Sequence, residues 1–103
     1  MEVTLLHVAG CPNLTVARDR LTEAAELTGG VVRFEEQMVR DHAEAAVLGF
    51  TGSPTILIAG TDPFAPDDTT PSVACRLYRT DAGLQGAPSV ADVVTVLRHE
   101  IGF

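Results

Sequence analysis

Cys11 is the residue of this sequence whose type and position best suit nucleophilic chemistry. It follows the apolar run "VTLLHV" and a break at Gly10, and Pro12 stands where the first residue of a helix would lie. A helix N-terminus offers unpaired N–H groups, here those of Asn13 and Leu14, and a partial positive charge, which together stabilise a nucleophilic thiolate. Cysteine is also a common core residue, so the pattern alone leaves Cys11 as a reactive thiol or a small buried side chain.

Pro54 and Cys75 are two further residues with chemistry of their own. Pro54 stands in "GSPTILI" before a third apolar run, where a proline either simply begins a strand or forms a cis peptide bond. Cys75 lies on the apolar side of the strand pattern "VACRLYRT", which favours a core position. Its other interpretation is a resolving thiol for Cys11. The expected direction of this strand, with Thr80 near the site and Val73 far from it, argues against that interpretation.

The remaining polar and aromatic candidates point less clearly to a site. Three histidines and two cysteines show no paired ligand spacing, so we expect no metal site. His7, four residues before Cys11, is either a core histidine or a group that holds a proton near the sulfur. Phe64, in the loop "TDPFAPDD", is either a lid or partner contact, or an aromatic side chain packed onto the sheet.

The elements that would position these residues alternate between strand and helix patterns. Gly29 and Gly30 end the first helix, Asp41 caps the second with Glu44 as its capping-box partner, and Ser89 caps the last. The predicted strands are residues 3–8, 31–39, 56–58 and 73–80, and the predicted helices are residues 12–28, 42–50 and 90–101. The order β-α-β-α-β-β-α indicates an α/β fold in a single domain, residues 1–103. Its central four-stranded mixed sheet carries helices on both faces.

This arrangement resembles the thioredoxin superfamily, and its Cys-Pro pair is close to the glutaredoxin pattern. The resemblance is carried by "GCPNL" after the first strand and "VLGFTGSPTILI" before the third, and it extends over nearly the whole chain. In that family a reactive cysteine begins the first helix and a cis-proline packs beside it, which here implies Cys11 and a cis Ser53–Pro54 bond. Leu14 stands where the family has its second cysteine, so the usual two-cysteine motif is absent.

A narrower resemblance is carried by the combination of "GCPN", "GSPT", "DPF" and "CRLY". These segments are similar to those of small bacterial thioredoxin-like proteins. Some of those proteins carry selenocysteine where Cys11 stands, and some are called alkylmercury lyases, which suggests an association with mercury resistance.

The resemblance implies a monothiol oxidoreductase that carries out thiol–disulfide exchange. Its partner would be a disulfide-containing protein or a small thiol, with glutathione or another low-molecular-weight thiol as co-substrate and no bound cofactor. The implied site residues are catalytic Cys11 and Pro54 and substrate-binding Pro12, Asn13 and Ser53, while the resolving-thiol interpretation of Cys75 stays open beside them. The N–H and C=O of Ser53 would be free to pair with an extended substrate segment. The alternative is a non-catalytic binding module for a partner or for a soft metal such as mercury or copper(I).

Charge and hydropathy narrow the range of partners and locations. Seven basic against fourteen acidic residues give a net charge of −7, a surface that nucleic acid or an anionic membrane would repel. No apolar run approaches the roughly 18 residues that span a bilayer, and "MEVTLL" lacks the basic flank of a signal peptide. We therefore expect a cytoplasmic protein with no nucleic-acid or membrane partner, whose two cysteines do not form a structural disulfide.

Overall fold

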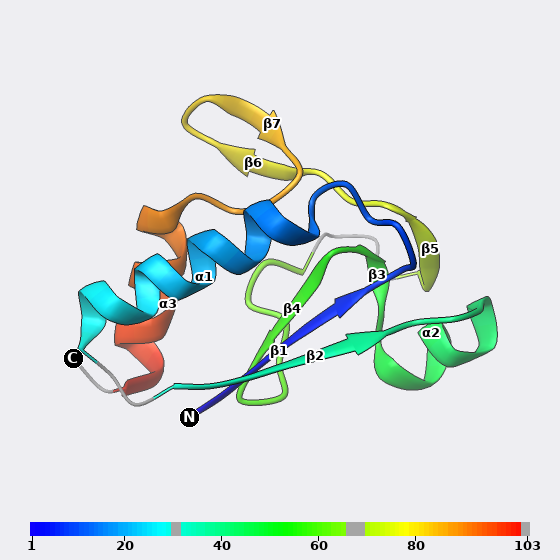
Figure 1. Cartoon of the computed structure of the whole chain (residues 1–103), viewed down its shortest axis with the longest axis horizontal. Coiled ribbons are helices and arrows are strands. Elements are labelled where there is room, and N and C mark those ends of the chain that lie inside the picture. The colour runs from blue at the N-terminus through cyan, green and yellow to red at the C-terminus, as the bar shows by residue number, and fades with distance from the viewer. Residues whose placement is uncertain (30–31, 66–69, 102–103) are drawn as a thin grey trace.

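Strand β1 (Glu2–His7) is the middle strand of the central sheet in the computed structural model, which describes residues 1–29, 32–65 and 70–101. It pairs in parallel with β2 (Arg33–Met38) and antiparallel with β4 (Thr55–Ile58), so that Leu5 lies opposite both Glu36 and Ile56. The sheet order is β2-β1-β4. The apolar run that predicted a first strand is thus confirmed, and the fold is mixed α/β (Figure 1).

Side chains of β1 enter two separate cores because they alternate between the two faces of the sheet. Val3 and Leu5 belong to a core shared with helices α1 (Leu14–Thr28) and α3 (Val90–Ile101), which lie against each other. Leu6 belongs to a second core with Phe50 and with Ala45 of helix α2 (His42–Leu48). The helices therefore cover both faces of the sheet, as the sequence predicts (Figure 1).

The predicted end of α1 and the predicted caps of α2 and α3 agree with the structure, but the start of α1 and the end of α2 do not: α2 ends at Leu48, before Gly49, rather than at Phe50. Gly29 ends α1 in the left-handed conformation, with φ of 61°. Asp41 accepts a 2.8 Å hydrogen bond from the N–H of Glu44, and Ser89 accepts one of 3.1 Å from the N–H of Asp92. Helix α1 begins at Leu14 rather than at Pro12, because the chain turns at residues 12 and 13 before the helical bonds start.

The predicted fourth strand is broken into two pieces that belong to different sheets. Strand β5 (Ser72–Cys75) pairs in parallel with β3 (Thr51–Ser53), whereas β6 (Tyr78–Thr80) pairs antiparallel with β7 (Gly83–Gln85). In the described residues the central sheet thus has three strands, and the prediction of four is wrong. The cause lies between the pieces, where the chain leaves the sheet to bury the side chain of Arg76 while Leu77 remains exposed.

Strand β2 is more exposed than its alternating pattern indicates. All six of its residues are solvent-exposed, and Phe34 and Met38 retain 43% and 45% of their accessible surface. The reason is that β2 is an edge strand, and Val32, just before it, packs against the first core instead. Val31, at the start of the predicted strand, lies outside the described residues. Among the helices of the described ranges, none combines the length and apolar character that a membrane crossing requires.

Candidate functional site

The thiol loop, residues 8–13, joins β1 to α1 and carries Cys11. The Cys11 side chain is partly exposed and is not in a disulfide. Its N–H donates to the carbonyl of Val8 at 3.3 Å, and its own carbonyl accepts from the N–H of Leu14 at 3.4 Å. The interpretation of Cys11 as a sealed core residue is therefore wrong. The N–H of Leu14, predicted to point toward the sulfur, is directed at the Cys11 carbonyl.

Pro12 and Asn13 occupy different surroundings on the far side of Cys11. Pro12 is exposed and lies before the helix. Asn13 is the N-cap of α1, but its side chain makes no capping hydrogen bond, and no acidic residue stands in the first helical turn. The Asn13 side chain packs against Gly86, where an added Cβ would come within 2.1 Å of Asn13 Cγ. The Asn13 side chain thus packs against the chain that leaves β7, and in this position it occupies the space that a Cβ at residue 86 would take.

Ser53 and Pro54 form the buried support of the thiol loop. The peptide bond between them is cis, as the sequence predicts, and both residues are fully buried. The hydroxyl of Ser53 accepts a hydrogen bond from the N–H of Val8 at 3.1 Å. Val8 therefore connects the Ser53–Pro54 unit to Cys11, because its N–H donates to the Ser53 hydroxyl and its carbonyl accepts from the N–H of Cys11. The carbonyl of Ser53 accepts from the N–H of Arg76 at 2.9 Å, so the expectation that it is free for a substrate is wrong.

Cys75 lies beside this support rather than in the core. It is exposed, it is the register partner of Ser53 in the β3–β5 pair, and it is not in a disulfide. Both expectations about it are therefore wrong, the core position and the placement far from the site. The physical reason is the break at Arg76, because a continuous fourth strand in the central sheet would have carried Cys75 to the opposite end.

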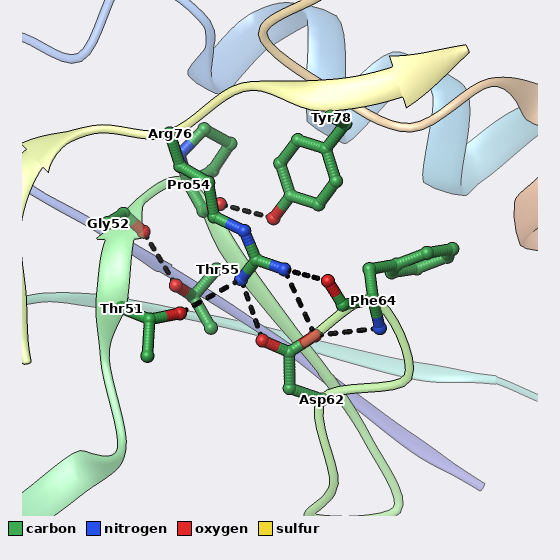
Figure 2. Close-up of polar contacts among 8 residues, drawn as sticks. All are labelled: Thr51, Gly52, Pro54, Thr55, Asp62, Phe64, Arg76 and Tyr78. Atoms are coloured by element: carbon green, nitrogen blue, oxygen red, sulfur yellow. Dashed lines mark hydrogen bonds and ion pairs between the residues drawn. The ribbon is translucent and has the colours of Figure 1, made fainter. Parts of the chain in front are cut away.

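Behind Pro54 lies a group of side chains that we call the Arg76 cluster: Thr51, Asp62, Phe64, Arg76 and Tyr78 (Figure 2). The guanidinium of Arg76 makes an ion pair with Asp62 at 2.7 Å, and the two side chains are only 6% and 11% exposed. It also donates to the hydroxyl of Thr51 at 3.2 Å and to the carbonyl of Phe64. The ion pair thereby holds the loop after β4 against β3.

Tyr78 connects the Arg76 cluster to the cis-proline. Its hydroxyl donates to the carbonyl of Pro54 at 2.5 Å, and its ring lies 4.4 Å from the guanidinium carbon of Arg76 (Figure 2). Burial raises the pKa of the Tyr78 hydroxyl well above its usual range. The Arg76 cation opposes this rise in pKa, and the nearby Asp62 and Cys11 anions add to it.

The side chain of Phe64 packs against the protein interior rather than projecting into solvent. Its ring meets that of Tyr78 edge to face at 5.9 Å between centroids, and it lies against the first core. Of the two interpretations left open for Phe64, the structure agrees with the one in which its side chain packs inward. Phe64 and Tyr78 also line an open cavity of about 490 Å³ with Leu77, Arg79 and other residues of the β6–β7 region. His7 is partly buried, and its Nδ1 lies 3.1 Å from the carbonyl oxygen of Val8, to which it donates when Nδ1 carries the proton.

Arg76 and Tyr78 are the site residues that sequence reasoning missed. A signal was present, since an arginine in the strand pattern "VACRLYRT" must either face solvent or find a buried partner. The partner, Asp62, lies in a loop 14 residues earlier, and no local pattern connects the two.

Within the described ranges, no three His, Cys, Asp or Glu side chains gather into a group that could hold a metal ion.

Known proteins supply no identification of this site. Comparison of the chain with protein-family profiles gives no match, and comparisons with the curated proteins and with the solved structures give none either.

Proposed function

We propose that this chain is a thioredoxin-like protein that carries out thiol–disulfide exchange through Cys11. The proposal is supported by the sequence of features along the chain: a central strand, a Cys-Pro pair, a helix, a parallel strand, a second helix and a cis-proline before the next central strand. The resemblance implies the same features in the same order. The break after Cys75 departs from it and concerns the edge of the sheet beyond β4.

One observation carries the proposal. Cys11 is an accessible, unpaired thiol, and a single residue, Val8, bonds both to its N–H and to the hydroxyl of Ser53 in the cis Ser53–Pro54 unit. The neighbouring end of α1 has no acidic side chain in its first turn and no side-chain cap from Asn13. Its partial positive charge is then available to a thiolate or to a departing thiolate.

The chemistry would run as two exchanges. The Cys11 thiolate attacks one sulfur of a substrate disulfide, a mixed disulfide forms on Cys11, and the other substrate sulfur leaves as a thiolate. The thiolate of an external small thiol such as glutathione then attacks the substrate sulfur of the mixed disulfide, forms a new disulfide with it, and Cys11 leaves as a thiolate. In this scheme Ser53 and Pro54 position the thiol loop from below, because both are buried and the Ser53 carbonyl already has a partner.

A second candidate function is the binding of a soft metal such as mercury(II) or copper(I). The observation that favours it is the exposure of Cys75 beside Ser53, which gives the site two unpaired sulfur ligands instead of one. Thiolates are the ligands that these metals prefer.

The decisive experiment isolates Cys11 in a Cys75→Ser chain and uses Cys11→Ser as its matched control. We expect the Cys11-only chain to be alkylated in the folded state and to turn over a glutathione mixed disulfide in the presence of excess glutathione, and the control chain to show no turnover. If the Cys11-only chain reacts only in denaturant, or is alkylated without turnover, exchange is excluded. Retention of mercury(II) or copper(I) by wild type under those conditions would identify the metal-binding function.

A further inference from the structure

We propose that Cys75 is the resolving thiol of this site, which would make the protein a two-cysteine catalyst although its Cys-Pro motif has only one cysteine. The inference rests on the proposed exchange function of Cys11 and adds a second step to it. It follows from the broken fourth strand, because that break brings β5 beside β3 and places Cys75 opposite Ser53.

The Ser53–Cys75 pair of β3 and β5 indicates where the Cys75 side chain faces. The register of the two strands shifts between Thr51 and Ser53, but Ser53 and Cys75 lie directly opposite each other. Residues directly opposite in neighbouring strands share a face of their sheet, so we infer that Cys75 projects on the same side as Ser53. On that side the Ser53 hydroxyl reaches the N–H of Val8 at 3.1 Å, and the Val8 carbonyl accepts from Cys11. The Cys75 thiol is therefore on the side of β5 that looks toward the thiol loop. The next residue, Arg76, directs its side chain into the Arg76 cluster.

A surface depression gives independent support for this closeness. The depression holds about 360 Å³ and is lined by Val8 and Ala9 of the thiol loop and by Val73 of β5, together with residues 38–40. Val73 and Cys75 thus belong to a strand that borders the same hollow as the residues just before Cys11. In Figure 1 the chain between β1 and α1 passes next to β5, in agreement with this lining.

The thiol loop has the freedom that bond formation would need. Ala9, Gly10 and Pro12 are exposed, and the backbone hydrogen bonds at Cys11 are long, at 3.3 and 3.4 Å. A disulfide requires the two Cα atoms to come within about 7 Å. Movement of the loop, rather than of β5, would supply that approach, since β5 is held to β3 by backbone pairing and by the Arg76 N–H.

The resolving step balances as follows. Cys11 carries a mixed disulfide with a substrate sulfur after the first exchange. The Cys75 thiolate attacks the Cys11 sulfur, a Cys11–Cys75 disulfide forms, and the second substrate sulfur leaves as a thiolate. The substrate disulfide is reduced by two electrons and the two cysteines are oxidised by two electrons. A low-molecular-weight thiol returns them to the reduced state by two further exchanges.

The test treats the reduced, dilute full-length chain with a small excess of glutathione disulfide, without free glutathione, and follows intact mass and cross-linked peptides. We expect wild type to lose the mass of two hydrogen atoms and to yield a peptide pair joined through Cys11 and Cys75. The Cys75→Ser chain should instead accumulate a glutathione adduct on Cys11. A matched control, Ala74→Cys with Cys75→Ser, keeps an exposed thiol one residue away from the register partner of Ser53 and should also keep the adduct.

Each other outcome overturns the inference in a distinct way. If wild type and Cys75→Ser accumulate the Cys11 adduct equally, Cys75 does not resolve it, while the exchange function of Cys11 stands. If the Ala74→Cys control closes a disulfide as fast as wild type, any thiol on β5 suffices and the placement of Cys75 has no special role. If Cys11 forms neither adduct nor disulfide in any chain, the inference and the proposed function fail together.

Discussion

The thiol loop and the Arg76 cluster lie on two sides of the same cis-proline, and they are built in opposite ways. The thiol loop has three exposed residues, Ala9, Gly10 and Pro12, and long backbone hydrogen bonds. In the Arg76 cluster Arg76 and Tyr78 are buried and the other three residues are partly buried, and in the described part of the chain no buried side-chain polar atom lacks a partner. The difference indicates that the reactive thiol and the contacts that stabilise the fold lie in separate regions. The thiol loop holds Cys11, and the side chains of the Arg76 cluster stabilise the structure next to it.

The largest test of this separation is Arg76→Met, which leaves the carboxylate of Asp62 buried without its cation. Removing one partner of a buried pair destabilises by about 3–5 kcal/mol, so we expect a loss of that size in the free energy of unfolding, measured by urea denaturation. Cys11→Ser, in the thiol loop, should stay within about 0.5 kcal/mol of wild type.

The double variant Arg76→Met, Asp62→Asn identifies the cause of that loss. Because the amide carries no charge and can still accept from the N–H of Phe64, it should recover much of the lost stability. A loss that the second substitution does not reduce would mean that packing, not the unpaired charge, is responsible.

Substitution of Gly52, a residue of β3 that lies next to Arg76, is expected to cause an intermediate loss of stability. Gly52 has φ of 131°, and a Cβ there would lie 2.8 Å from Cβ of Arg76. Gly52→Ala should therefore lower stability by about 1–3 kcal/mol through backbone strain, with the clash adding to it. Gly10→Ala in the thiol loop is the matched control, because its φ of 69° is left-handed but its Cβ meets nothing within 4 Å. Equal losses in thermal or urea unfolding would show that the two regions do not differ in packing.

The smallest effect sharpens the role of Tyr78. Tyr78→Phe removes the hydrogen bond to the Pro54 carbonyl and should lower the free energy of unfolding by about 1 kcal/mol near pH 7. Burial raises the pKa of the Tyr78 hydroxyl in the folded state. The hydroxyl therefore makes its full contribution to the free energy of unfolding at pH values below its unfolded pKa of about 10. Its contribution is lost as pH rises through the folded pKa.

The pH dependence gives Tyr78→Phe its own check. Unfolding measured at increasing alkaline pH should show the wild type losing stability above about pH 10 more steeply than Tyr78→Phe. Parallel curves for the two chains would mean that the phenol does not ionise on unfolding in the way its burial requires.

Local patterns predicted much of this fold because they depend on near neighbours along the chain. The β1 apolar run, the caps at Asp41 and Ser89 and the glycine end of α1 are all decided within a few residues. The cis bond before Pro54 came from the family resemblance rather than from local physics. Proline fits equally well just before a helix and at its first position, which is why the start of α1 was misplaced.

The parts that could not be predicted depend on contacts between distant segments. An alternating pattern across residues 73–80 looks the same whether or not Arg76 finds a buried partner, and Asp62 provides that partner from another loop. The sequence of β2 predicts that its side chains alternate between two faces, but it does not predict whether another layer of the fold covers those faces. In the structure β2 is an edge strand, and its side chains are exposed. The wrong prediction for the position of Cys75 followed from treating residues 73–80 as one continuous strand.

The division of β1 between two cores has a consequence for where the sulfur sits. Val3 and Leu5 fill one hydrophobic layer and Leu6 fills the other, so shifting this strand by a single residue would exchange the contents of both layers. Neither layer tolerates the exchange, which leaves the strand one permitted alignment against β4. Cys11 follows four residues after the end of that strand, and the point from which the thiol loop starts is therefore set by hydrophobic side chains that take no part in chemistry.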